Sequence, residues 1–250
     1  MRKSILITQS DYIPWKGYFD NINTVDEFVV YDDMQYTKRN WRNRNQIKTP
    51  QGLLWLTIPV NVKGKYFQKI NETQVSETKW GENHWRIIFA NYSKAKYFKN
   101  YKDIFESLFR DESLNNITNI NINFIKAINS ILNINTKIID SREFVLAEGR
   151  TERLVDICKR CNATDYYTGP AAKVYMDEKL FLNELINIHY FDYSNYPIYP
   201  QLFDNFSHNV SILDLIFNTG ENARTYMKTF SDEQKYLKTS RNTEIGRAHV

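Results

Sequence analysis

The amino-acid sequence predicts an α/β fold: a Rossmann-like parallel sheet with a β-hairpin and a helical insertion. Three observations predict it. Strand-like and helix-like segments alternate at the start of the chain, a basic segment contains a Pro-Gly turn, and helical periodicity fills residues 80–135. We therefore expect residues 1–240 to form a single domain of this class, with the helical insertion at about 80–135.

The first thirty or so residues predict a βαβ unit. Ser4–Thr8 is a short apolar run typical of a buried strand, and residues 27–31 (EFVVY) form another. Residues 14–22 between them predict a helix with proline in its first turn. Because such a crossover joins parallel strands, the turn after the first strand should lie at the carboxyl edge of the sheet, where α/β proteins bind ligands.

Residues 42–49 and 53–60 predict a hairpin, because Thr49-Pro50-Gln51-Gly52 between them has the residue types of a type I turn. In an extended first arm, alternate side chains share one face. One face holds Arg42, Arg44, Gln46 and Lys48, and the other holds Asn43, Asn45 and Ile47. The hairpin is therefore expected to present one cationic face, suited to an anionic ligand. A solvated basic hairpin is the alternative interpretation.

The rest of the chain alternates further helices and strands. The predicted helices span residues 80–100, 104–109, 117–131, 151–161, 171–185 and 211–218, and the predicted strands span 137–140, 165–168 and 188–193. The last helix has Ser211 as an N-cap by type, with Asp214 as its capping-box partner, and ends at Gly220. This order favours a sheet covered by helices.

Composition excludes several classes of protein. Hydrophobic residues make up 42% of the 250 residues, which suffices for a core and argues against disorder. A net charge of +4 is too mild to require a nucleic-acid partner. No apolar run approaches the roughly 18 residues of a membrane span, and the N-terminus lacks the apolar region of a signal peptide. We therefore expect a cytoplasmic protein without membrane insertion.

Two features of the sequence are given no role in function. Cys158 and Cys161 fall in a helical pattern, which favours a structural role over a redox pair or half of a zinc site. Residues 243–250 (TEIGRAHV) resemble a translated sequencing adapter, so we expect a non-native tail over 241–250 and exclude His249 from functional reasoning.

Five ordered blocks of sequence together carry a family resemblance. They are YIPWKGYFD (12–20), DDMQYTKRNWRNRNQIKTPQG (32–52), YYTGPAAKVY (166–175), YPIYPQ (196–201) and SILDLIFNTG (211–220). Together these blocks resemble the WbqC-like family from about residue 5 to about residue 228. Members are typically encoded among genes for O-antigen and other surface-glycan assembly, and some are suggested to add glycine or another aminoacyl group to an amino sugar. The resemblance therefore implies an enzyme of surface-polysaccharide sugar biosynthesis.

One position departs from the family pattern, which usually has His-Gln-Pro after the first strand. This chain has Thr8-Gln9-Ser10 instead. A threonine hydroxyl donates a hydrogen bond to an anion but cannot act as an acid or base near neutral pH. If the histidine is catalytic in relatives, this protein is impaired or uses another group. If the histidine only binds phosphate, Thr8 suffices.

Asp33, Arg44 and His208 are the predicted catalytic residues. An arginine fork matches the geometry of phosphate and carboxylate groups. A carboxylate such as that of Asp33 can hold a divalent cation or a substrate ammonium, with turn chemistry as the alternative. His208 lies just before the last helix and is the histidine best placed for acid–base chemistry. No nucleophile elbow, P-loop or zinc spacing is present, and no metal ligands are predicted.

Further residues are predicted to bind substrate, and they lie in four segments. The first turn places polar groups at a helix N-terminus, which favours anions. The basic segment adds amide and guanidinium groups, the glycine turn after residue 168 allows a ligand to approach closely with a lysine beside it, and residues 196–201 add aromatic rings. The residues are Thr8, Gln9, Trp15, Lys16, Gln35, Arg39, Asn43, Gly169, Lys173, Tyr199 and Gln201.

Three functions remain open on this basis. The first is transfer of an acyl or aminoacyl (glycyl-like) group, from a small acid or aminoacyl donor, to the amino group of a nucleotide-linked amino sugar. ATP and Mg²⁺ are cofactors that the sequence neither requires nor excludes. The second is a nucleotide-sugar binding protein without catalysis, which Thr8 favours slightly. The third takes its aminoacyl group from a charged tRNA, a partner that the mild net charge does not favour.

Overall fold

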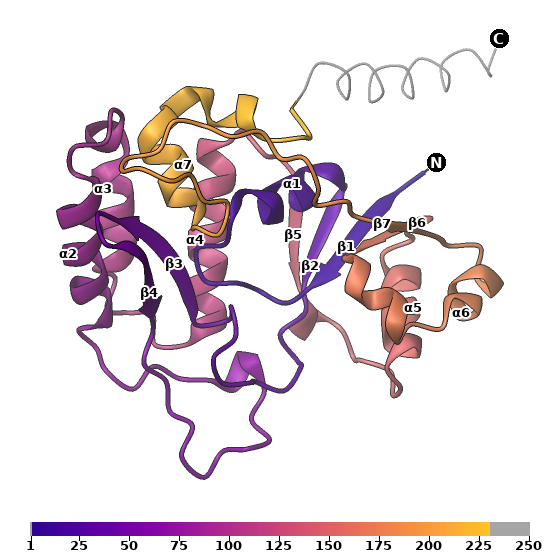
Figure 1. The fold of residues 1–250 in the computed structure, drawn as a ribbon. Helices are drawn as coiled ribbons and strands as arrows, with labels where there is room; N and C mark the ends of the chain where they lie inside the picture. The colour runs from indigo at the N-terminus through magenta and orange to yellow at the C-terminus, as the bar shows by residue number, and fades with distance from the viewer. Residues whose placement is uncertain (1, 231–250) are drawn as a thin grey trace.

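The computed structural model describes residues 2–230. At its centre is a five-stranded sheet in the order β5-β2-β1-β6-β7 (Figure 1). Every pair of neighbouring strands in it is parallel. The strands are β1 (Ser4–Thr8), β2 (Glu27–Val30), β5 (Lys137–Asp140), β6 (Asp165–Thr168) and β7 (Asn187–Tyr190). The predicted α/β class with a parallel sheet is confirmed.

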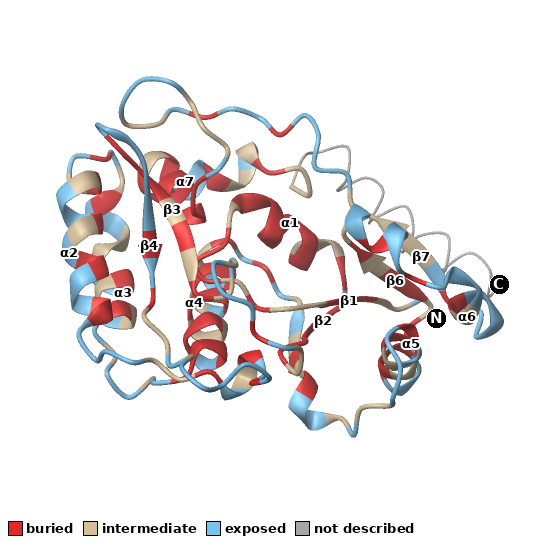
Figure 2. Cartoon of the chain, turned by 60° about the horizontal axis from the view of Figure 1, so that its bottom comes forward, coloured by how far each residue is buried: buried red, intermediate tan, exposed pale blue. Residues whose placement is uncertain are grey.

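Both faces of the sheet are buried, and alternate residues of each strand belong to different cores. Leu6 and Phe28 pack into one apolar cluster, whereas Ile5 and Val29 pack into the other. The first cluster is covered by α1 (Lys16–Thr24) and the helical insertion. The second is covered by α5 (Thr151–Arg160) and α6 (Glu178–Asn183), and Figure 2 shows the buried sides of these elements turned inward. Two covered faces explain why the first strands are apolar throughout.

The predicted hairpin forms a separate antiparallel sheet of β3 (Arg44–Thr49) and β4 (Gly52–Thr57). It does not present one cationic face, so that expectation is wrong. Lys48 is buried, and its Nζ donates to Gln201 Oε1 at 3.1 Å and to the Phe203 carbonyl at 3.0 Å. A segment about 150 residues away in sequence therefore covers this end of the basic face.

Helices α2, α3, α4 and α7 pack together beside the hairpin (Figure 1). The single helix predicted over residues 80–100 is wrong, because the chain turns between two helices there and the Tyr97 amide donates to the Phe217 carbonyl at 2.9 Å. Aromatic stacking of Trp85 on Phe98 and Phe109 joins these two helices. The four helices are α2 (Trp80–Tyr92), α3 (Phe98–Phe109), α4 (Ile117–Ile131) and α7 (Ile212–Thr219).

Two further predictions concern the later part of the chain. The helix predicted over 171–185 is replaced by a 3-10 turn (Pro170–Val174) and the short α6, whose cap is Asp177. Ser211 caps α7 as predicted, since its hydroxyl accepts from the Leu213 amide at 3.3 Å. Asp214 has another role than that of capping-box partner: it is fully buried and accepts from the hydroxyls of Tyr92 and Tyr199.

Cys158 and Cys161 are both buried and carry free thiols. Among residues 2–230, no helix is both long enough and apolar enough to cross a membrane. The expected non-native tail at 241–250 lies outside the described residues.

Candidate functional site

The strand order creates a topological switch point between β1 and β6. The chain leaves β1 toward β2 on one side and later returns to place β6 on the other side. Ligands of open parallel sheets bind outside the carboxyl ends of strands at such a point. Here the carboxyl ends of the two strands are at Thr8 and Thr168, and both residues line a cavity of about 580 Å³, the switch-point pocket.

The switch-point pocket contains three of the predicted binding residues, Thr8, Gln9 and Gly169. Lys173 is not among its lining residues. Lys173 is exposed and its Nζ lies 4.5 Å from the centroid of the Tyr190 ring. The helix predicted to begin at residue 171, on whose first turn Lys173 would lie, is replaced by a short 3-10 turn that begins at Pro170.

Two arginines that sequence reasoning missed supply the charge of the switch-point pocket. Arg150 stands at the N-cap of α5, with its guanidinium 3.7 Å from the centroid of the Tyr175 ring. Arg153 lies on the first turn of α5 and donates to the Ala147 carbonyl at 2.9 Å and to the Tyr31 hydroxyl at 3.3 Å. Both guanidinium groups thus lie beside a helix N-terminus; hydrogen bonds hold that of Arg153, whereas Arg150 is exposed and stacks on a ring.

The electrostatics of the switch-point pocket favour an anion. Among its described lining residues there is no aspartate, glutamate or histidine. Two guanidinium groups and the N-terminal end of α5 attract negative charge, and arginine forks match phosphate oxygens. The same absence of carboxylate and imidazole groups means that these lining residues offer no base for proton transfer near neutral pH.

A second cavity, of about 220 Å³, lies between the first turn, the hairpin and the segment before α7. Two of its walls are indole rings, so we name it the ring-walled pocket; its lining includes Asp11, Trp15, Trp41, Asn45 and His208. Trp15 and His208 were predicted from the sequence, whereas Asp11 and Trp41 were not. This pocket contains the two titratable groups that the switch-point pocket lacks.

The environment shifts the pKa of both titratable groups. Burial raises the pKa of Asp11 from 3.8 to about 6, Arg42 opposes this shift with its Nη1 2.7 Å from Oδ1, and Asp32 adds to it. Burial and the charge of Lys16 lower the pKa of His208. The imidazole is therefore neutral near pH 7, and in the described part of the chain its buried Nδ1 has no hydrogen-bond partner.

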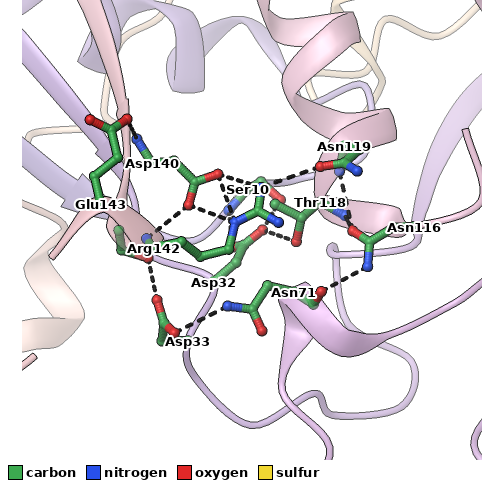
Figure 3. A network of polar contacts seen from close by, with 11 residues as sticks. Ser10, Asp32, Asp33, Asn71, Asn116, Thr118, Asn119, Asp140, Arg142 and Glu143 are labelled. Carbon is green, nitrogen blue, oxygen red and sulfur yellow. Dashed lines mark hydrogen bonds and ion pairs between the residues drawn. The ribbon is translucent and has the colours of Figure 1, made fainter. Parts of the chain in front are cut away.

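A buried network fixes the loop that joins the two pockets. Asp32 accepts from the Ser10 amide at 2.8 Å, from the Ser10 hydroxyl at 2.6 Å and from the Thr118 hydroxyl at 2.7 Å (Figure 3). Thr8 and Asp11 flank this anchor and are three residues apart, so their Cα atoms lie within about 11 Å of each other. The two pockets therefore lie at neighbouring positions of the same loop, although they share no lining residue.

Asp33 and Arg44 lie outside the lining of both pockets. Asp33 accepts from the Ser141 hydroxyl and from Asn71 Nδ2 at 3.1 Å, at the lower edge of the network in Figure 3. Arg44 donates to the Arg39 carbonyl at 2.6 Å and stacks its guanidinium 4.1 Å from the centroid of the Trp55 ring. These contacts give both residues a structural role, and their catalytic role stays a prediction.

The other predicted binding residues also have partners within the protein. Lys16 is buried and donates to the carbonyls of Pro197 and Tyr226, and Asn43 donates to the Ile58 carbonyl at 2.7 Å. The Tyr199 hydroxyl donates to Asp214 at 2.8 Å. Gln201 donates to the Ser207 carbonyl, Gln35 donates to the Tyr66 carbonyl, and Arg39 is exposed. Their role in binding stays a prediction.

Comparison with known proteins places the chain in a family. The model of the WbqC-like protein family matches residues 9–226. The chain belongs to the WbqC-like protein family. A curated Mycobacterium tuberculosis relative, "Uncharacterized protein Rv1507c", is 48% identical over 226 residues, which cover 90% of this chain and 98% of the relative. No solved structure matches.

The family match includes every residue named above in the ring-walled pocket, and in the switch-point pocket all those named except Thr8. Sequence signals existed for the residues that were missed. Asp11 follows the first strand at the same edge as Thr8 and Gln9, and Arg150 and Arg153 are cations at a predicted helix start, where the helix dipole disfavours them. Trp41 stands out in the sequence as a ring among the basic residues of 38–48, but its place in the ring-walled pocket depends on packing between distant segments.

Proposed function

We propose that this protein transfers an acyl or aminoacyl group to the amino group of a nucleotide-linked amino sugar during surface-polysaccharide (O-antigen) assembly. The observation that carries the proposal is the switch-point pocket, an arginine-lined cavity at the carboxyl ends of two parallel strands. Such a protein would act in the cytoplasm, where nucleotide-linked sugars are made.

The nucleotide end of the substrate suits the switch-point pocket. Arg150 and Arg153 match the charge and geometry of a diphosphate, and the Thr8 hydroxyl adds a donor at the end of β1. Tyr175 lies beside Arg150 and is 46% exposed, so its ring is the one available to a nucleobase, whereas Tyr31 is buried. Gly169 lets the ligand approach the backbone closely.

The acyl transfer itself requires a base. The neutral amine attacks the carbonyl carbon, the N–C bond forms, the leaving group departs with its electron pair, and the nitrogen loses one proton. Asp11 and His208 are the available proton acceptors, because Asp11 is mostly ionised at pH 7 and the His208 imidazole is neutral. We therefore assign the chemistry to the ring-walled pocket and nucleotide binding to the switch-point pocket.

A second candidate function is nucleotide-sugar binding without catalysis. Thr8 favours it, because this residue lines the switch-point pocket where the family pattern has a histidine. A hydroxyl can bind phosphate there but cannot replace an imidazole as base. Both candidate functions predict that the protein binds a nucleotide sugar, but only the first predicts turnover.

Thermal unfolding of the purified protein tests the proposal. A uridine- or thymidine-diphosphate amino sugar at about 100 times its dissociation constant should stabilise the protein by about 2.7 kcal/mol. Mass spectrometry of mixtures with acids plus ATP–Mg²⁺, or with aminoacyl-tRNA, should then show an acylated sugar. Stabilisation without product from any donor supports the binding protein, and no stabilisation by any nucleotide sugar contradicts both functions.

A further inference from the structure

The carboxylate of Asp11 forms an ion pair with Arg42 but accepts no hydrogen bond from the described residues. Arg42 contacts Oδ1 at 2.7 Å and also donates to the Ser10 carbonyl at 3.3 Å. No hydrogen bond from another described residue reaches Oδ2. The side chain is only 17% exposed, so its solvation by water is poor. A donor from a ligand in the ring-walled pocket would therefore gain a strong, charge-assisted hydrogen bond.

Neighbouring rings hold the two indole walls in place. The Trp15 ring lies 5.0 Å from the Tyr196 ring and 5.7 Å from the Tyr193 ring. The Trp41 ring lies 5.3 Å from the Trp55 ring. Indole faces attract cations and also accept the apolar faces of small molecules. A carboxylate that lines the same pocket as two tryptophans favours a ligand that combines a positive charge with C–H surface.

We propose that the ring-walled pocket is an amine site: Asp11 holds the ammonium group of a monosaccharide-sized molecule, and Trp15 and Trp41 hold its ring. A cavity of about 220 Å³ admits one such molecule and not a nucleotide sugar as a whole. Binding of the amine follows from the contacts of this pocket alone. The reaction of the bound amine rests on the proposed function.

Charge argues against an anion in this pocket. Among its described lining residues, Asp11 is the one with a formal charge at pH 7, because the environment keeps His208 neutral. The cations that act on its two titratable groups, Arg42 on Asp11 and Lys16 on His208, already have oxygen partners. Arg42 is paired with Asp11, and the ammonium of Lys16 donates to two backbone carbonyls.

Binding of glucosamine and glucose tests this inference, because the two sugars differ by one amine in place of a hydroxyl. Calorimetry, with tryptophan fluorescence as a second readout, should give an affinity for glucosamine at least about tenfold higher than for glucose at pH 7. Asp11→Asn should remove the difference, and Trp41→Ala should weaken binding of both sugars. Asp103→Asn, which neutralises an exposed carboxylate, is the matched control and should change neither.

Each outcome bears on one proposal separately. Equal affinities for the two sugars, no binding of glucosamine at millimolar concentration, or a difference that survives in Asp11→Asn while the variant stays folded, would overturn the amine site. None of these results affects nucleotide binding by the switch-point pocket. Conversely, glucosamine binding with no binding of nucleotides would keep the amine site and contradict the proposed function.

Discussion

The two pockets on either side of Ser10 differ in almost every chemical property. The switch-point pocket is large, carries two arginines and has no group that titrates near neutral pH among its described lining residues. The ring-walled pocket is smaller, with a carboxylate and an imidazole between indole rings. The difference fits the proposed function, in which one pocket binds the nucleotide and the other positions and deprotonates the reacting amine.

Removal of the Asp32 carboxylate, which anchors the connecting loop, should lower the stability of the protein more than the other substitutions proposed below. Asp32→Ala removes three hydrogen bonds from Ser10 and Thr118 at a site that is 1% exposed. We expect the free energy of unfolding to fall by about 3 kcal/mol, because the orphaned donors stay buried, and nucleotide affinity to fall as well. Urea denaturation and calorimetry measure the two effects.

Asp26→Ala is the matched control for the Asp32 variant. Asp26 accepts the same pair of hydrogen bonds, from the Ser4 amide at 2.8 Å and the Ser4 hydroxyl at 2.7 Å, but it is exposed. Asp26→Ala should lower the free energy of unfolding by about 1 kcal/mol and should leave both pockets intact. Equal effects of the two variants would show that burial of the anchor does not matter.

Arg153→Ala should separate the two pockets. Removing one guanidinium from the switch-point pocket should weaken binding of a nucleotide diphosphate by about 10- to 100-fold, which is about 1.4–2.8 kcal/mol. Binding of glucosamine should be unchanged. Arg160→Ala is the control on the same helix, since Arg160 is exposed and pairs with Asp156 at 2.8 Å. If nucleotide affinity falls equally in both variants, the general charge of the protein and not the pocket attracts the ligand.

Local patterns were enough to predict the frame that places the pockets. The bounds of β1, β5, β6 and α4 follow from short apolar runs and helical periodicity, which depend on residues near in sequence. The predicted βαβ unit led to Thr8 and Gln9 at the carboxyl edge, and the glycine turn after the strand 165–168 led to Gly169. The helix expected over 171–185 failed because Asp177 starts a new helix, its carboxylate accepting from the Lys179 amide.

Contacts between distant segments were not predictable from one sequence. Lys48 was expected on an open cationic face, but the side chain of Gln201 and the carbonyl of Phe203 bury it. Asp11 and His208 share a pocket although almost two hundred residues separate them. No periodicity or motif encodes such a meeting, since it depends on how the segment before α7 crosses the first turn.

The pH dependence of stability tests the environment of Asp11. The folded pKa of about 6 lies above the unfolded value of 3.8, so between these pH values the folded protein binds more protons. The free energy of unfolding therefore falls as pH rises through this window, although Arg42 reduces the effect and Asp32 adds to it. Asparagine does not ionise, so Asp11→Asn should not lose stability in this window. Above pH 6 it should be more stable than the unmodified protein by about 1–2 kcal/mol.

The comparison between variant and parent isolates Asp11 from other groups. His84, whose pKa burial lowers to about 4, destabilises both proteins on acidification, so its contribution cancels in the difference. Denaturant unfolding at pH 4 and pH 8 measures the effect, and the two proteins should have nearly equal stability at pH 4. A difference of the same size at both pH values would show that packing, not charge, distinguishes them.

Lys173→Ala should have the smallest effect on nucleotide affinity, in contrast to Arg153→Ala. Lys173 is a cation close in sequence to the switch-point pocket, but it is exposed and lies over the Tyr190 ring. A solvated ammonium outside the cavity should change nucleotide affinity by less than about twofold, because water and salt screen its charge. Calorimetry at two salt concentrations checks this. A loss as large as that of Arg153→Ala would mean that the nucleotide extends over Pro170–Val174, beyond the cavity assigned to it.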